Sequence, residues 1–247
     1  MQWIILFSLC IATFSANSKA QEHSIEQLLN IEIATYQLSS AFSAYVLFTG
    51  IPKYDQGLEK VIATTNPILA NAQSNYPGIV DKWQESLGYI ERSKELVFSP
   101  DDHRLIIGIS AYLNPLYQQI ELNKQSITQG NKTSAPLPPA LEEYLTIRIS
   151  FERAIAQYTA FSASSAGFVH SDISLEDNVN TFSSQIESIK NKGEDYQRLN
   201  MKWNFIKSNM LKNPGETSPF ITLHTAIDMR KTLQRIYKND FVTNSGI

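Results

Sequence analysis

Histidines close to carboxylates are the residues of this chain best suited to metal binding or acid–base chemistry. The four histidines are His23, His103, His170 and His224. His224 and Asp228 are spaced four residues apart, so in a helix both side chains lie on one face and could contact one metal ion. A metal site needs at least three protein ligands, and no other predicted helix carries a matching pair. We therefore predict that His224 is a helix-surface histidine beside an acid.

Three further polar clusters have a structural explanation that is simpler than a catalytic one. Asp101-Asp102-His103 follows Ser99-Pro100, at a predicted helix start where the helix dipole favours carboxylates. His170-Ser171-Asp172 lies in a predicted loop and suits a turn or a helix cap. Glu142 and Glu143 could form an acid–base pair, but neighbouring helical side chains point about 100° apart. We expect the first two clusters to be structural and Glu142-Glu143 to be a solvated face near the N-terminus of a helix.

The sequence motifs of phosphate binding, hydrolysis and haem attachment are absent. The ten glycines are never closer than seven residues to one another, which excludes both the GxGxxG turn and the P-loop. There is no GxSxG elbow and no HExxH pair, and the single cysteine is Cys10. The sequence therefore predicts no catalytic, cofactor-binding or metal-ligating residue, and no cofactor. A hydrolase remains an open alternative, because catalytic triads are recognised by geometry and not by spacing.

The charge pattern excludes two classes of partner. The formal net charge is −3, and no block of like charges occurs. Nucleic-acid binding needs clustered lysines and arginines, so we predict no nucleic-acid partner. No polybasic segment is available for an anionic membrane surface either.

Residues 1–20 are predicted to be a signal peptide. The apolar run from Trp3 to Phe14 has 12 residues, too few to span a bilayer as a helix. Small residues at Ser18 and Ala20 favour cleavage between Ala20 and Gln21. Because no Lys or Arg precedes the run, an uncleaved anchor is the alternative. The cleaved protein would be periplasmic or extracellular, with no cysteine and no stable membrane insertion.

Apolar residues recur every three or four positions in eight segments, which predicts an all-α fold. The first segment begins at the capping box Ser24-Ile25-Glu26-Gln27 and ends before Gly50-Ile51-Pro52. The last runs from Pro219 to about Tyr237, followed by a polar tail. No useful length of chain alternates with a period of two, so we expect almost no β-structure.

The eight segments fall into two sets of four that repeat each other. In the later part of each set, residues match at an offset of 120: Ile79/Leu199, Trp83/Trp203, Ile90/Met210, Ile109/Met229, Leu113/Leu233, Leu116/Ile236 and Tyr117/Tyr237. In the earlier part the offset is 117: Gly50/Gly167, Leu58/Leu175, Ile62/Val179 and Leu69/Ile186. The polar stretch Lys190-Asn191-Lys192-Gly193 can hold the three extra residues.

This repetition predicts two tandem duplicated up-down four-helix bundles with a pseudo-repeat of about 117–120 residues. The units are residues 21–123 and 140–247, joined by a polar, proline-containing linker at 124–139. The linker includes Asn131-Lys132-Thr133, a glycosylation sequon in a eukaryotic source. A linker of this length allows two separate bundles or one packed body.

Two features of the repeat have both a structural and a functional interpretation. Trp83, Trp203, Tyr117 and Tyr237 could clamp a sugar or a cation, but large rings at helix-facing positions more often fill a core. The small residues of 161–167, FSASSAG, replace the bulky AYVLFTG of 44–50. Since small residues allow close approach, this difference points weakly to a binding surface on the second unit.

The sequence favours an exported, non-catalytic helical module that binds a protein partner or a small ligand. This expectation rests on the fold class and not on a recognised site. The alternative is a ligand- or metal-binding sensor domain with its site between helices. A protein-binding module should expose a large apolar patch, a sensor should have a pocket with inward polar groups, and an enzyme should hold perturbed acids or histidines in a cleft.

Overall fold

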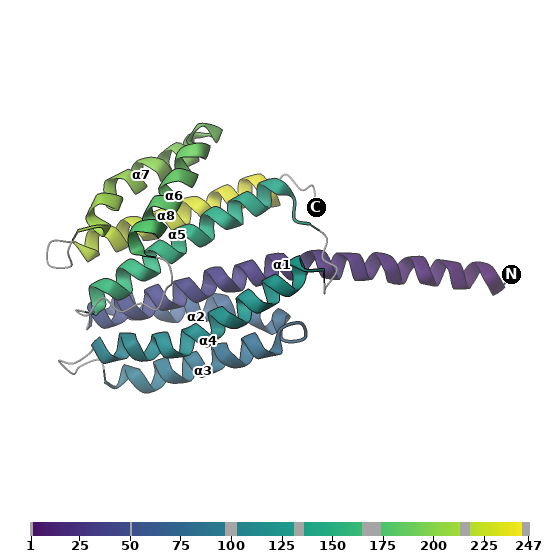
Figure 1. The fold of residues 1–247 in the computed structure, drawn as a ribbon, viewed down its shortest axis with the longest axis horizontal. Coiled ribbons are helices and arrows are strands. Elements are labelled where there is room, and N and C mark those ends of the chain that lie inside the picture. Colours follow the sequence, from purple (N-terminus) through teal and green to yellow (C-terminus); the bar gives the residue numbers. More distant parts are fainter. Residues whose placement is uncertain are drawn as a thin grey trace.

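A computed structural model describes residues 2–49, 51–96, 103–130, 136–164, 174–212 and 218–243, and for residues 2–24 and residue 103 it describes the backbone only. Every regular element in these ranges is a helix, so the predicted all-α fold is confirmed. The main helices, labelled in Figure 1, are α1 Gln2–Leu47, α2 Pro52–Ala72, α3 Pro77–Lys94, α4 His103–Thr128, α5 Pro139–Ala163, α6 Leu175–Ile189, α7 Glu194–Met210 and α8 Pro219–Tyr237.

Helix starts follow ordinary capping chemistry. Proline occupies the first turn of α2, α3, α5 and α8, where its fixed φ suits a helix and its missing N–H has no partner to lose. Ser174 caps α6, since its hydroxyl accepts a hydrogen bond from the Asp177 backbone N–H at 3.0 Å. A 3-10 turn at Lys190–Lys192 links α6 to α7, at the position where the three extra residues were predicted.

Two helices are longer than the sequence pattern predicts. α1 does not begin at the Ser24 capping box; it begins at Gln2, because no Gly or Pro interrupts the chain before Gly50. α4 continues through Lys124–Thr128, the first part of the predicted linker. There Ile127 packs against the core, and Gly130, with φ of +76°, follows the helix end.

The end of the chain also differs from the predicted polar tail. Lys238–Val242 forms a π-helical turn after α8. Phe241 packs against the rings of Tyr144 and Tyr237 at 5.4 and 5.9 Å between centroids. The apolar ring explains the difference, because burying it against α5 holds the turn to the body.

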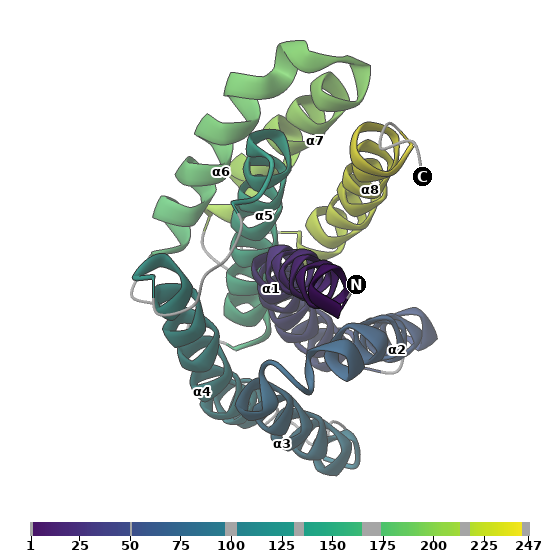
Figure 2. The same ribbon diagram turned by 90° about the vertical axis from the view of Figure 1, so that its right-hand side faces the viewer.

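α1 and α5 lie side by side at the centre of the molecule. The end-on view shows α2, α3 and α4 grouped on one side of this pair, and α6, α7 and α8 on the other (Figure 2). Two clusters of buried apolar side chains correspond to these groups. They share the central pair: Ile33 and Ala44 of α1 belong to the α5–α8 cluster, and Ala160 of α5 belongs to the α1–α4 cluster. The structure is therefore one packed body, one of the two arrangements that the linker allows.

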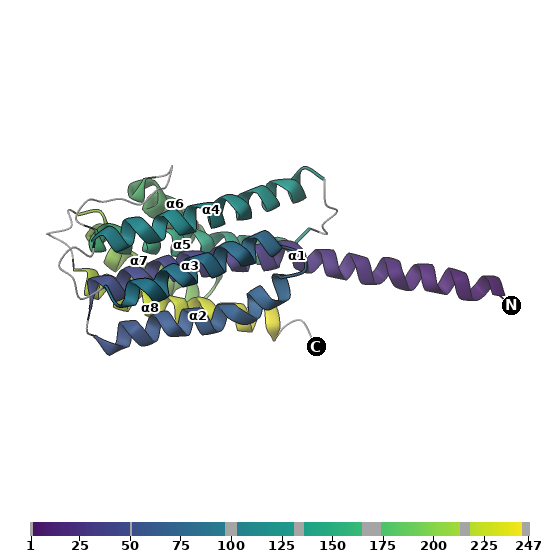
Figure 3. The same cartoon turned by 90° about the horizontal axis from the view of Figure 1, so that it is seen from below.

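The N-terminal part of α1 extends beyond this body as a single helix (Figures 1 and 3). Within the described part of the chain, no helix combines the length and apolarity needed to cross a membrane.

The two repeated tryptophans lie in the core. Trp83 and Trp203 are fully buried in the α1–α4 and α5–α8 clusters respectively. Trp203 meets Phe182 edge-on at 4.6 Å and donates a hydrogen bond from Nε1 to the Ser183 hydroxyl at 2.7 Å. Trp83 Nε1 has no partner among the described groups. Neither indole face is open to a sugar or a cation. The structure therefore supports a core-packing role for Trp83 and Trp203.

Candidate functional site

His224, which was considered as a metal ligand and predicted to be a surface histidine, is exposed on α8. Its Nε2 is 2.6 Å from Lys53 Nζ, and its ring packs against Phe220. Asp228 contacts Lys231 at 3.2 Å and Lys202 at 3.9 Å. In the described ranges, no group of three His, Cys, Asp or Glu side chains is placed to hold a metal ion.

The other polar clusters from the sequence give no common site. Asp101, Asp102 and residues 170–172 lie outside the described residues, as do Asn131 and the end of the 161–167 segment. Of the adjacent pair on α5, Glu143 forms an ion pair with Lys192. Glu142 is exposed and lines a different cleft, described below.

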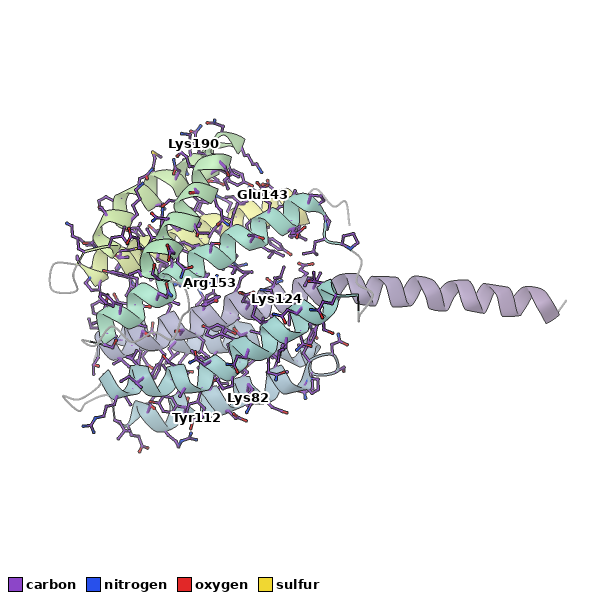
Figure 4. All side chains as sticks on the ribbon, in the orientation of Figure 1. Lys82, Tyr112, Lys124, Glu143, Arg153 and Lys190 are labelled. Atoms are coloured by element: carbon purple, nitrogen blue, oxygen red, sulfur yellow. The ribbon has the colours of Figure 1, made fainter. Side chains whose placement is uncertain are left out.

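Two buried glutamates, neither of which was predicted from the sequence to have a role, lie along the contact between α1 and α5. Glu32 of α1 is 1% exposed. Its carboxylate accepts hydrogen bonds from Lys124 Nζ of α4 at 3.0 Å and from Arg153 Nη2 of α5 at 3.2 Å. Arg153 and Lys124 come from different helices and converge toward α1 (Figure 4). This cluster, Glu32, Lys124 and Arg153, ties three helices together.

The second buried glutamate, Glu152 of α5, is fully buried. Arg230 of α8 donates to it from Nε at 2.9 Å and from Nη2 at 2.6 Å. Gln37 of α1 adds a hydrogen bond at 2.6 Å, and Arg230 also contacts the Ser40 hydroxyl at 3.3 Å. Paired arginine donors of this kind satisfy a buried carboxylate that would otherwise be costly.

Tyr36 joins the first cluster and provides a test of it. Arg153 Nε donates to the Tyr36 hydroxyl at 2.8 Å, and the Tyr36 ring stacks on Tyr117 at 4.8 Å. Burial raises the pKa of Tyr36 to about 12; Glu32 adds to the increase, and Arg153 opposes it.

We expect alkaline pH to destabilise the protein partly through Tyr36. The pKa of Tyr36 in the folded protein lies above the ordinary value of 10.0. The protonated phenol therefore contributes its full stabilisation of the fold below about pH 10, and this stabilisation is lost as pH rises toward about 12. Tyr36→Phe should therefore lose less stability than the wild type between these pH values. Urea unfolding at a series of alkaline pH values measures both slopes, and equal slopes would contradict the assignment.

A cleft of about 550 Å³ lies on the other side of α1 from this cluster, between α2 and α8. In Figure 2 these two helices flank α1. The α1 side chains that form its floor are Asn30, Ile33, Ala34, Gln37, Ser40, Ala41 and Ala44. The walls come from α2, between Lys53 and Ile68, and from α8, between Leu223 and Gln234, with Arg148 contributed by α5.

The charged side chains that line this cleft are all basic. Five of its lining residues are basic: Lys53, Lys60, Arg148, Arg230 and Lys231. None of the described lining residues is Asp, Glu or His. Arg230 is neutralised by Glu152, and Lys231 contacts Asp228. The other three cations form no salt bridge with any carboxylate that the structure describes, so the cleft holds a local excess of positive charge in a protein of net charge −3.

One buried hydroxyl of a residue in the cleft wall lacks a hydrogen-bond partner. Tyr54 of α2 is 5% exposed and stacks on Phe48 at 4.5 Å between centroids. Its hydroxyl has no partner among the described groups. Burial raises the pKa of Tyr54, so the phenol is a neutral donor at physiological pH. A buried donor without a partner costs free energy, and this hydroxyl has almost no accessible surface of its own.

A second cleft, of about 480 Å³, lies between α1, α4 and α5. Its charged lining residues are Glu32, Lys124, Arg153 and Glu142. Three of these already form the Glu32 cluster, so the charges of this cleft are balanced within the protein. It therefore makes a weaker ligand site than the cleft between α2 and α8.

Comparisons with known proteins add no identity to this site. No family model, no curated protein and no solved structure matches the chain. The cleft geometry and the sequence are therefore the basis on which function is inferred.

Proposed function

We propose that this protein is an exported, non-catalytic helical module that binds a small ligand in the cleft between α2 and α8. The observation that carries the proposal is the cleft itself, which has a mostly apolar floor and basic walls. Its volume is in the range of small-molecule sites, which are mostly apolar concavities with a few fixed polar groups. Export rests on the predicted leader at residues 1–20.

The lining chemistry favours binding over catalysis. General acid–base steps use His, Asp or Glu most often, and the described lining residues include none of these. The two buried glutamates are both held by arginine, which suits a structural role. The sensor alternative shares the same cleft and differs only in requiring a conformational response to the ligand.

We also infer that the two helix groups arose by tandem duplication of a four-helix unit. In support, the residues of all six aliphatic and tryptophan pairs with the 120-residue offset are buried in both halves. Tyr36 and Arg153, which are partners at the 117-residue offset, touch each other across the central contact. Contact between equivalent positions is expected where two like units pack about a two-fold axis.

Gly57 allows the cleft to be blocked without disturbing the fold. It lines the cleft from α2, and a Cβ added there would meet nothing within 4 Å. Gly57→Trp should place an indole in the cleft, while Gly57→Ala should leave the cleft open and raise helix propensity by about 1 kcal/mol. The two variants form a matched pair.

Native mass spectrometry of protein expressed in an exporting host tests the proposal. We expect the wild type and Gly57→Ala to carry a small-molecule adduct that denaturation releases, and Gly57→Trp to lack it. The same spectra report the mature mass and therefore whether the leader is cleaved after Ala20. A wild-type protein without any adduct, or an adduct that Gly57→Trp retains, would contradict small-ligand binding in this cleft.

A second candidate function, protein binding, has one specific observation in its favour. Met201 and Phe205 of α7 are 64% and 65% exposed, and Phe220 and Ile221 of α8 are also exposed. Clustered exposed apolar side chains are typical of interaction surfaces. The positions 120 residues before Met201 and Phe205 are Asp81 and Glu85, so this patch is confined to the second half. Crosslinking that captures a partner in the wild type but not in Met201→Asp/Phe205→Glu would favour this function.

A further inference from the structure

We infer that the cleft between α2 and α8 binds an anionic amphiphile, with the apolar chain along the α1 floor and the anionic head held by the basic walls. This inference rests on the proposed small-ligand function and specifies the chemical class of the ligand.

The shape of the cleft favours a long, narrow molecule. Its floor follows α1 from Asn30 to Ala44, which at 1.5 Å per helical residue is about 20 Å. Most of the floor and much of both walls are apolar: Ile33, Ala34, Ala41, Ala44, Val61, Ile68, Leu223 and Ile227. A compact polar ligand such as an amino acid or a sugar phosphate would leave most of this surface uncovered, whereas an alkyl chain would cover it.

The sign of the head group follows from the lining charges. Lys53, Lys60 and Arg148 face the cleft without a described carboxylate partner. Arg148, the only lining residue from α5, is half-buried. Cations gathered around one cleft repel one another, and an anion placed among them removes that repulsion. A neutral head group could accept a hydrogen bond but would leave the repulsion in place, and a cationic head group would add to it.

Lys60 supplies the directional contact. It is exposed and lies on the α2 wall of the cleft, together with Gly57. A carboxylate or phosphate oxygen can accept a lysine N–H, and charge-assisted hydrogen bonds are about twice as strong as neutral ones. The head group is therefore placed at the α2 wall.

Binding of four ligands with the same alkyl chain separates the contributions of head and tail. We would titrate the full-length protein, freed of co-purified ligand, with dodecanoate, dodecyl phosphate, dodecanol and dodecyltrimethylammonium by calorimetry. Both anions should bind, with dodecanol at least about tenfold weaker and the quaternary amine weakest. A preference between the two anions identifies the source, a fatty-acid carboxylate or a phosphate head group. Dodecanol binding as tightly as dodecanoate would overturn the inference.

Charge reversal locates the head group. Lys60→Glu should weaken dodecanoate binding by at least about tenfold. Lys238→Glu makes the same charge change at an exposed position outside the cleft and should have little effect. Equal losses in Lys60→Glu and Lys238→Glu would mean a general charge effect and would contradict the assigned site.

The failure of this inference and the failure of the proposed function give different results. If a native adduct is lost in Gly57→Trp but neither anion binds to the ligand-free protein, the cleft is a ligand site for another chemical class. If Gly57→Trp changes neither the adduct nor the titrations, both are wrong. Circular dichroism of every variant confirms that the helices are retained.

Discussion

Arg230→Met should lower the free energy of unfolding by about 3–5 kcal/mol, because it leaves a buried carboxylate without its cation. Glu152 is fully buried, and Arg230 provides its only salt bridge among the described residues. Gln37 would remain as a single neutral hydrogen-bond donor. A neutral amide stabilises a buried carboxylate less than an arginine does, so most of the cost should persist. Chemical denaturation followed by circular dichroism measures it.

Two control variants distinguish the loss of a buried pair from the loss of any arginine. In the double variant Arg230→Met/Glu152→Leu no unpaired charge remains, so much of the stability should return. Arg235→Met removes an arginine from the more exposed pair with Asp195, and exposed pairs contribute about 1 kcal/mol or less. A cost for Arg230→Met no greater than that for Arg235→Met would show that the Glu152 pair does not hold the helices together.

Trp203→Ala should lower the free energy of unfolding by about 3–5 kcal/mol, and Trp83→Ala by a similar amount, because each empties the centre of one apolar cluster. Both side chains are fully buried. The cost is measured by the same denaturation experiment. A loss below about 1 kcal/mol with the fold intact would contradict the core assignment and return the aromatic clamp to consideration.

Phenylalanine variants of the two tryptophans should differ from each other. Trp203 Nε1 donates to Ser183 at 2.7 Å, whereas Trp83 Nε1 has no described partner. Trp203→Phe therefore leaves the Ser183 hydroxyl without its donor and should cost about 1 kcal/mol more than Trp83→Phe. Ser183→Ala provides the control, since in that background the difference between the two phenylalanine variants should shrink.

The helices were predictable because their signals are local. Proline at the first turn marked the start of α8, and apolar residues at the 120-residue offset identified the buried face, including both tryptophans. The predicted start of the first helix at the Ser24 capping box was wrong. A favourable cap can begin a helix only where the preceding chain is not already helical. Here the glycine- and proline-free segment before it forms part of α1.

The cleft was not predictable, because its walls come from distant parts of the chain. Lys60 and Arg148 carry no motif, and only the packing of α2 and α8 beside α1 places them around one space. The buried glutamates could have been recognised from their apolar neighbours in the sequence. Glu32 lies between Ile31 and Ile33, and Glu152 follows Phe151. A charge within a stretch that is apolar on several helix faces indicates a central helix with an internal ion pair.

The central position of α1 constrains how the chain reaches its folded state. α1 is synthesised before the other described helices, yet Ile33 and Ala44 complete a cluster made mainly by α5, α6, α7 and α8. Glu32 and Gln37 likewise find partners on α5. Synthesis must therefore reach α5 before α1 can bury the face that packs against the α5–α8 cluster. Distant contacts of this kind require the entropic cost of loop closure to be met before they add any stability. We therefore expect the nascent first half to carry an exposed apolar helix face that a chaperone can bind.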